Sequence, residues 1–146
     1  MKTFSLVCMF FLISAQIALT SVFASYKDEW SRLKNQNQLF DEKIEQNIKS
    51  TFSLNTDGFK NISELKLALL TERDSTLIDI LNVTYNFRKS GCIGSPIIYL
   101  KPQSAYILVK DKEGKNVLIH MSKITNNHSN VHWKITKVDK KSSSEE

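Results

Sequence analysis

The spacing of hydrophobic residues changes along this chain of 146 residues and divides it into three parts. Residues 4–24 carry no charged side chain, residues 26–51 carry apolar residues at helical spacing, and from Thr76 onward apolar and polar residues alternate. Helical spacing is typical of an amphipathic helix, and alternation is typical of a strand with one buried face. The pattern therefore predicts an α+β fold in which helices precede strands.

Residues 1–24 have the organisation of a secretory signal peptide. Lys2 provides a short positive start, the apolar stretch follows, and residues 22–24 place small side chains where a signal peptidase cuts. The alternative is an uncleaved signal anchor, because 21 uncharged residues are just long enough to cross a bilayer. In both cases we expect residues 25–138 to form a single exported domain. Its location would be periplasmic or secreted, with residues 4–24 as the only membrane contact if they are retained.

Two helices are predicted before the strands. In the first, residues 26–51, the apolar residues form one stripe in which Asn37 fills the vacant place. Such a stripe packs on a sheet or on a partner, so it provides the candidate partner surface: Trp30, Leu33, Phe40 and Ile44. The second helix is short and is predicted to begin at an Asn61 cap, with Glu64 as the reciprocal partner of a capping box.

About five strands joined by short turns are predicted to follow. They cover residues 76–87, 97–101, 105–111, 116–124 and 131–138. Short turns join only antiparallel neighbours, so we expect an antiparallel meander packed on the helices, with a partial barrel as its curled form. The turn at residues 112–115 is predicted to be a hairpin with Gly114 in the left-handed region. Residues 139–146, DKKSSSEE, are predicted to form a disordered tail.

Two further expectations concern the faces of these strands. Residues 76–100 are predicted to be the central hairpin of the sheet, with Cys92 at its tip. In the last strand Val131, Trp133 and Ile135 are expected to face the core, and the residues between them to face solvent.

Basic residues concentrate in the C-terminal half of the chain. Residues 88–141 hold 11 basic and 3 acidic side chains, whereas residues 25–87 hold 8 basic and 10 acidic ones. Such asymmetry suits an anionic partner. Lysines spaced along strands also form a solvated face that protects a sheet, and this second interpretation is preferred. Because the lysines form no continuous run and the chain is expected to be exported, no nucleic-acid partner is predicted.

Cys92 is the only cysteine outside the apolar N-terminal segment, so no internal disulfide is predicted. It is interpreted first as a small, partly buried residue and, alternatively, as an intermolecular thiol in an oxidising compartment. A Cys92–His120 or Cys92–His132 pair would make the chain a thiol-dependent enzyme. No family signature surrounds the cysteine, and no helix is expected before it to lower its pKa. We therefore expect a protein without catalytic residues.

His128 and His132 have the spacing of half a zinc site, but no thiol or carboxylate cluster accompanies them. No metal and no cofactor is therefore predicted. Sequons begin at Asn61, Asn82 and Asn127 and would be glycosylation sites in a eukaryotic protein, although Asn82 is expected to lie within a strand. The low cysteine content favours a bacterial envelope protein instead.

A hydrophobic N-terminal segment (Phe4–Ala24) that runs into an amphipathic helix and a small exported β-rich domain with one cysteine resembles small periplasmic accessory proteins of the ToxS, MyfF and PsaF type. The resemblance implies a non-catalytic protein that binds and supports an envelope or membrane protein, such as a membrane-bound regulator of gene expression. It assigns no residue roles, because no diagnostic motif carries it. Two alternatives stay open. One is a small apolar-ligand binder, because a curled sheet under helices can enclose a cavity. The other is a secreted inhibitor of the cystatin kind, although its Q-x-V-x-G loop is absent.

Overall fold

The computed structural model describes the backbone of residues 2–125 and 130–142 and the side chains of residues 26–125 and 130–142. The chain divides into two compact units, Met1–Leu39 and Phe40–Glu146. Helix α1 (Lys2–Thr51) begins in the first unit and ends in the second. The predicted export segment, residues 1–24, lies outside the residues whose side chains are described. Among those that are, no helix is long and apolar enough to cross a membrane.

The second unit contains a five-stranded antiparallel sheet whose strands follow one another in chain order, from β1 to β5. This arrangement confirms the α+β class and the antiparallel meander. The sheet is open, with β1 and β5 as its edges, and does not close into a barrel. The elements are β1 (Lys60–Ile62), α2 (Glu64–Thr71), the 3-10 turn η1 (Ser75–Leu77), α3 (Ile78–Ser90), β2 (Cys92–Leu100), β3 (Ser104–Asp111), β4 (Asn116–Thr125) and β5 (Val131–Lys141).

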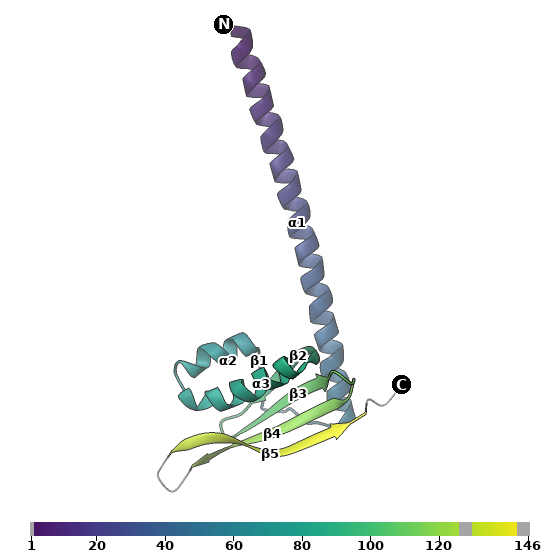
Figure 1. Ribbon diagram of the computed structural model, residues 1–146, viewed down its shortest axis with the longest axis vertical. Helices are drawn as coiled ribbons and strands as arrows, with labels where there is room; N and C mark the ends of the chain where they lie inside the picture. Colours follow the sequence, from purple (N-terminus) through teal and green to yellow (C-terminus); the bar gives the residue numbers. More distant parts are fainter. Residues whose placement is uncertain (1, 126–129, 143–146) are drawn as a thin grey trace. The chain divides into compact units, whose positions relative to one another are not determined.

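Both faces of the sheet are covered by helices. Figure 1 shows α2 and α3 lying over one face, and these helices share a core with that face: Ile62, Leu67, Leu77, Ile80, Ile98, Ala105, Ile107, Val109, Val117, Ile119, Met121 and Trp133. The last turns of α1 cover the opposite face in a smaller core: Ile44, Ile48, Ile97, Tyr99, Leu108 and Leu118. The central parts of β2, β3 and β4 are therefore buried on both sides, which explains their nearly continuous apolar residues; His120 interrupts the run in β4.

The predicted strand at residues 76–87 is wrong, because this segment forms η1 and the first ten residues of α3. The prediction that two N-terminal helices precede all strands is also wrong. Strand β1 comes before α2, and both α2 and α3 lie between β1 and β2. The central hairpin predicted at residues 76–100 is consequently a helix followed by one strand. The strand count of five is nevertheless right, since β1, which the sequence analysis missed, replaces the strand that became α3.

Two periodicities coexist in residues 76–87, and tertiary packing selects the helical one. Leu77, Ile80 and Thr84 are spaced by three and four residues, and all three are buried against the sheet. Ile78 and Tyr85, which the alternating pattern counts as equivalent to buried positions, are exposed. β-Branched residues cost only a few tenths of a kcal/mol each in a helix, whereas burying a Leu or Ile contributes about 1.5–3 kcal/mol. Packing therefore outweighs local preference.

The start of α2 is capped by a different residue from the one predicted, and the end of α1 forms a motif for which no prediction was made. Asn61 lies in β1, and the N-cap of α2 is Ser63, whose hydroxyl accepts a hydrogen bond from the backbone N–H of Lys66 at 3.3 Å. At the end of α1, Ser53 adopts a positive φ of 48°. The N–H of Leu54 donates to the carbonyl of Lys49 at 2.9 Å, and the N–H of Ser53 donates to that of Ser50 at 3.1 Å. This pair of bonds is a Schellman motif in which Ser53 holds the position that glycine usually takes.

Strand β2 begins earlier than predicted, at Cys92, and contains an irregularity between Ile93 and Ile97. Gly94 lies within it at a φ of 73°. A Cβ at Gly94 would lie 2.6 Å from Cδ1 of Ile44 and 2.8 Å from Oδ1 of Asp41. Glycine is therefore required here both by the backbone conformation and by the close approach of α1.

At the other end of the chain, β5 extends to Lys141, so residues 139–141 belong to the sheet and not to the predicted tail. Residues 143–146 lie outside the described residues. In β5 only Trp133 is buried, at 5% exposure, whereas Val131 and Ile135 are exposed by 37% and 41%. The prediction that all three face a core is thus right only for Trp133, because α3 does not cover the whole edge strand.

Candidate functional site

Cys92 is the first residue of β2 and follows the end of α3 by two residues, so the expectation that no helix precedes it is wrong. That helix ends toward the cysteine, and the negative end of a helix dipole does not favour a thiolate. Burial raises the pKa of the thiol, although the nearby positive charge of Arg88 opposes this shift. The sulfur lies 3.3 Å from the carbonyl oxygen of Gly94. Cys92 is therefore a protonated, half-buried thiol, as its interpretation as a small core residue requires.

The sheet register separates Cys92 from both of the histidines considered as its partners. Cys92 lies opposite Asp111 of β3, whereas His120 lies opposite Tyr106 of the same strand. Five residues of a strand span roughly 17 Å. His132 is farther still, because it pairs with Ile124, beyond the residues of β4 that face β3. No nucleophile pair of Cys92 with His120 or His132 is formed.

The histidines also do not assemble a metal site among the residues that the structure describes. His128 lies outside the described residues, and no group of three or more potential metal ligands occurs in the rest. Nε2 of His120 lies 3.3 Å from a carboxylate oxygen of Asp139, which itself pairs with Lys137 at 2.9 Å. The hydrogen bond from Lys137 lowers the pKa of Asp139. This cluster lies in an open depression of about 380 Å³ beside the end of α1.

The predicted partner surface on α1 has two different environments. In the first unit, Trp30 and Leu33 are exposed by 65% and 44%. In the second unit, Phe40 is half exposed, but Ile44 is 6% exposed and packs against β2 and its neighbours. Ile44 is therefore a core residue, and its assignment to a partner surface is wrong. In the sequence, the apolar residues of α1 form one continuous helical face. In the structure, the sheet covers only the C-terminal end of that face.

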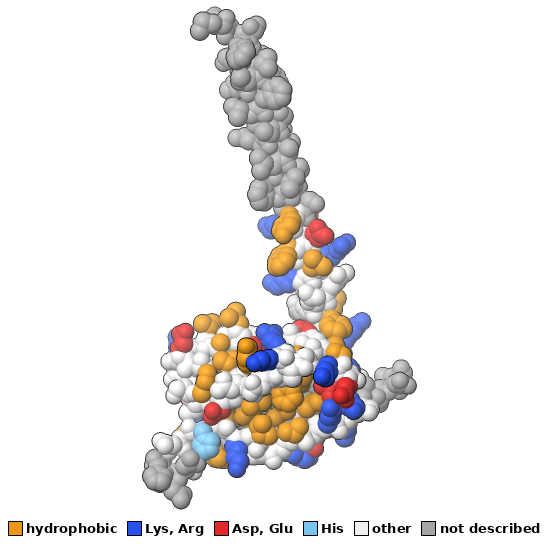
Figure 2. Space-filling model, in the orientation of Figure 1, with side chains coloured by type: hydrophobic (Ala, Val, Ile, Leu, Met, Phe, Trp, Pro, Cys, Tyr) orange, Lys and Arg blue, Asp and Glu red, His pale blue; other side chains and the backbone are white. Residues whose placement is uncertain are grey.

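An apolar groove lies on the other face of the sheet, between α3 and β5. It has a volume of about 470 Å³ and is lined by Asp79, Asn82, Val83, Met121, Trp133, Lys134 and Ile135. Figure 2 shows the hydrophobic side chains gathered over the sheet beside the helices. The groove exists because α3 packs over the centre of the sheet and leaves the side chains of β5 uncovered. Val138, farther along β5, is exposed by 53% and extends the apolar area.

A specific hydrogen bond joins the two walls of the groove. A carboxylate oxygen of Asp79, in the first turn of α3, accepts a hydrogen bond from the backbone N–H of Trp133 at 2.9 Å. Trp133 forms part of the floor, and its indole nitrogen is buried without a hydrogen-bond partner among the described residues. A buried, unpaired donor is uncommon in a protein interior. The arrangement offers apolar contact area together with a few polar groups at its rim, which is the composition of a binding surface.

Strand β5 adds a second feature, since it is a long edge strand of 11 residues that pairs only with β4 in the described part of the chain. Its other side presents backbone N–H and C=O groups that another strand can pair with. Its exposed lysines protect this edge against non-specific pairing. Lys134, Lys137 and Lys140 are all exposed.

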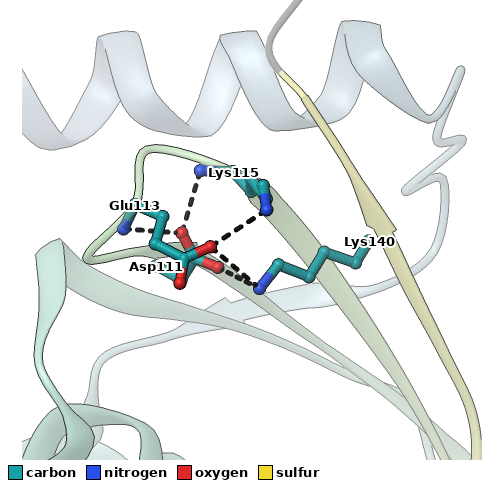
Figure 3. A network of polar contacts seen from close by, with 4 residues as sticks. All are labelled: Asp111, Glu113, Lys115 and Lys140. Atoms are coloured by element: carbon teal, nitrogen blue, oxygen red, sulfur yellow. Dashed lines mark hydrogen bonds and ion pairs between the residues drawn. The ribbon is translucent and has the colours of Figure 1, made fainter.

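The C-terminal part of β5 is tied to the β3–β4 hairpin by four charged side chains (Figure 3). Lys140 lies 2.5 Å from a carboxylate oxygen of Asp111, and Lys115 pairs with Glu113 at 2.9 Å. Asp111 also accepts hydrogen bonds from the backbone N–H groups of Glu113 and Lys115, each at 2.9 Å. Burial raises the pKa of Asp111, but the hydrogen bond from Lys140, together with the two backbone hydrogen bonds and the positive charge of Lys140, outweighs it and holds the pKa below its usual value. Gly114 has a φ of 79°, which confirms the predicted hairpin turn.

The asparagines of the three sequons lie in different parts of the chain: one in β1, one in α3 and one outside the described residues. Asn61 is exposed in β1 and donates a hydrogen bond to Glu45 at 3.3 Å. Asn82 lies exposed on α3 at the rim of the groove, and not within a strand. Asn127 lies outside the described residues. The hydroxyl of Thr84, the third sequon residue after Asn82, is buried and donates to the carbonyl of Ile80 at 2.8 Å.

The groove cannot be seen in the sequence pattern, because that pattern predicts a strand for residues 76–87, which include one wall of the groove. Asp79, Asn82 and Val83 share a side only when residues 78–90 are helical. The sequence does contain a signal for the helix. Leu77, Ile80 and Thr84 have helical spacing, and Gly91 comes two residues after the basic pair Arg88-Lys89, as at a helix end. Comparison of the chain with protein-family models, with curated proteins and with solved structures finds no match in any of the three.

Proposed function

We propose that the chain is a non-catalytic accessory protein of the cell envelope that binds and supports a protein partner through the groove between α3 and β5. The observation that carries this proposal is the open apolar groove beside a long edge strand. The apolar N-terminal segment, residues 4–24, supports an exported or membrane-attached location. The proposed partner is an envelope or membrane protein, such as a regulator anchored in the same membrane.

The groove favours an extended or strand-forming segment of the partner. Such a segment pairs its backbone with the free edge of β5 and places alternate side chains over the groove. Ile135 and Val138 are 41% and 53% exposed, so covering them removes apolar surface from water and stabilises the complex. The exposed lysines of β5 favour a partner segment that carries acidic residues between its apolar ones.

Site-specific photocross-linking in the native envelope tests this proposal. A benzophenone amino acid at Ile135 is expected to form a discrete adduct with one envelope protein. The same probe at Lys112, which is exposed in the β3–β4 turn, is the matched control and is expected to form none. An additional Val138→Glu substitution is expected to reduce the Ile135 adduct at least several-fold. Equal adducts from both positions, or none from Ile135, would contradict the proposal.

A small apolar ligand is the second candidate occupant, because the groove volume of about 470 Å³ lies in the range of small-molecule sites. Trp133 lines the groove and reports on binding, provided that Trp30 is replaced by Phe so that only one indole emits. Titration with fatty acids or retinoid-like probes is then expected to change the emission of Trp133 with saturation. A linear, non-saturating response would eliminate this candidate.

A further inference from the structure

Three of the four large apolar residues described in the first unit, Tyr26, Trp30 and Leu33, follow a heptad spacing, whereas the exposed Leu39 lies off this stripe. Tyr26 and Trp30 are four residues apart, Trp30 and Leu33 three, and Leu33 and Asn37 four. Alternating steps of four and three define the d and a positions of a coiled coil, with Tyr26 and Leu33 at d and Trp30 and Asn37 at a. The sequence continues the same steps at Phe40. The mean period of 3.5 residues keeps the stripe facing a second, supercoiled helix.

The side chains of this stripe are accessible. Tyr26, Trp30 and Leu33 are exposed by 69%, 65% and 44%, and Asn37 is also exposed. Two large aromatic residues on one side of a helix leave much apolar surface in water, and covering that surface would be favourable. The polar and charged residues of the same helix indicate which partner would cover it.

Asn37 identifies a second copy of this helix as the fitting partner. A single Asn at an a position of a coiled coil favours a parallel, in-register dimer, because the two Asn side chains face each other and form a hydrogen bond. In an antiparallel pair an a residue faces a d residue, so Asn37 would lie against an apolar side chain and lose that bond. The cost of an unpaired polar group then disfavours the antiparallel arrangement.

The flanking charges lead to the same orientation. With this register, Glu29 occupies a g position, and Lys27 and Lys34 occupy e positions. In a parallel dimer each g residue lies beside the e residue of the next heptad on the other helix, so Glu29 pairs with Lys34 of the second copy. In an antiparallel dimer e residues flank e residues, and lysines would face lysines. Charge complementarity therefore exists only in the parallel arrangement.

We propose that the first unit pairs with that of a second copy of this chain in a parallel, two-stranded coiled coil, through Tyr26, Trp30, Leu33 and Asn37. Two heptads make a short interface, so the pairing depends on local concentration. Retention of residues 4–24 as an anchor would hold both copies parallel in one membrane and raise that concentration. The groove between α3 and β5 is not involved, and the proposal is independent of the function proposed above.

Disulfide cross-linking of the full chain in membranes tests this arrangement. Cys8 and Cys92 are first replaced by Ser, and single cysteines are then introduced as Asn37→Cys or Asn35→Cys. Asn37 lies at the centre of the proposed interface, whereas Asn35 lies at an f position on the outer side of the same helix. Mild oxidation is expected to give at least tenfold more dimer from Asn37→Cys than from Asn35→Cys. Equal yields, or no dimer from Asn37→Cys, would overturn the proposal.

A charge exchange tests the orientation without changing the apolar residues. Lys34→Glu in the Asn37→Cys background is expected to lower the dimer yield several-fold, because Glu29 then faces a second carboxylate on the other helix. Adding Glu29→Lys is expected to restore the yield. An antiparallel pair would respond oppositely, since Lys34→Glu would relieve the repulsion between lysines and increase the yield. Benzophenone adducts at Ile135 are expected to stay unchanged in these variants, which separates a failure of this proposal from a failure of the proposed function.

Discussion

Asn116 provides a test of how α1 is attached to the sheet. This residue begins β4 and is fully buried. Its side-chain amide donates hydrogen bonds to Oδ1 of Asn47 at 2.8 Å and to the hydroxyl of Thr51 at 2.7 Å. Both acceptors lie on the last turns of α1. The three side chains therefore form a polar connection between the two layers, beside the apolar contacts of Ile44 and Ile48 and further hydrogen bonds such as that between Tyr99 and Glu45.

Replacing Asn116 by Ala removes both hydrogen bonds and leaves a small cavity. Each hydrogen bond contributes about 1 kcal/mol net, and the half-buried hydroxyl of Thr51 loses its donor as well. The vacated volume adds a further penalty. We expect the free energy of unfolding to fall by roughly 2–4 kcal/mol. This is a large fraction of the total for a domain of this size, which is about 5–15 kcal/mol.

Urea unfolding of the full chain, followed by far-ultraviolet circular dichroism, measures this change as a shift of the midpoint at constant slope. Thr84→Val is the matched control. Thr84 is equally buried, but its hydroxyl bonds only to the carbonyl of Ile80 in its own helix, so a loss of less than about 1 kcal/mol is expected. The double variant Asn116→Ala/Asn47→Ala is expected to be less destabilised than the sum of the two single variants, because they share a bond. A loss below about 1 kcal/mol for Asn116→Ala, or strict additivity, would refute the polar connection.

Three further predictions concern the backbone and the charges. Gly94→Ala is expected to destabilise the protein by about 1–3 kcal/mol more than Gly114→Ala. Both glycines have positive φ, but an added Cβ meets Ile44 only at Gly94 and nothing within 4 Å at Gly114; equal midpoint losses in urea would contradict the close approach. Ser53→Gly is expected to raise stability by about 0.5 kcal/mol, because Ser53 occupies the left-handed position of the Schellman motif; a lower thermal midpoint would count against it. Asp111 has a lowered pKa, so its contribution is present at neutral pH and is lost as the pH falls below about 4. Wild type is therefore expected to be more stable than Asp111→Asn at about pH 6, and the difference is expected to shrink at about pH 3; a constant difference would show that the carboxylate charge is not responsible.

The part of the fold that could be predicted is the part in which local pattern and tertiary environment agree. Residues 104–125 alternate or run apolar between clear turns, and the hairpin at Gly114 has a residue that suits its φ. Residues 76–87 show the opposite case. Their β-branched residues and alternation favour a strand, and only the sheet below makes the helical stripe of Leu77, Ile80 and Thr84 the favourable one to bury.

The candidate site depends still more on tertiary structure. The stripe on α1 was found from sequence, because a helical face is visible in spacing alone. The sequence did not distinguish Trp30, which is exposed, from Ile44, which is buried, because that difference depends on where the sheet meets the helix. The groove was missed because Val83 and Ile135 are far apart in the sequence and meet only when α3 packs beside β5.

The sequence by itself determined the α+β class, the amphipathic helix at residues 26–51, the antiparallel order of the later strands and the absence of an internal disulfide in residues 26–146. These properties follow from local spacing and composition, which do not change on folding. Tertiary structure alone decided that residues 78–90 are a helix, that Lys60–Ile62 forms an edge strand, and that a groove opens along β5. The physical reason is one of magnitude. Local preferences differ by tenths of a kcal/mol per residue, whereas burial contributes kcal/mol per side chain and depends on surfaces that come together only in the folded chain.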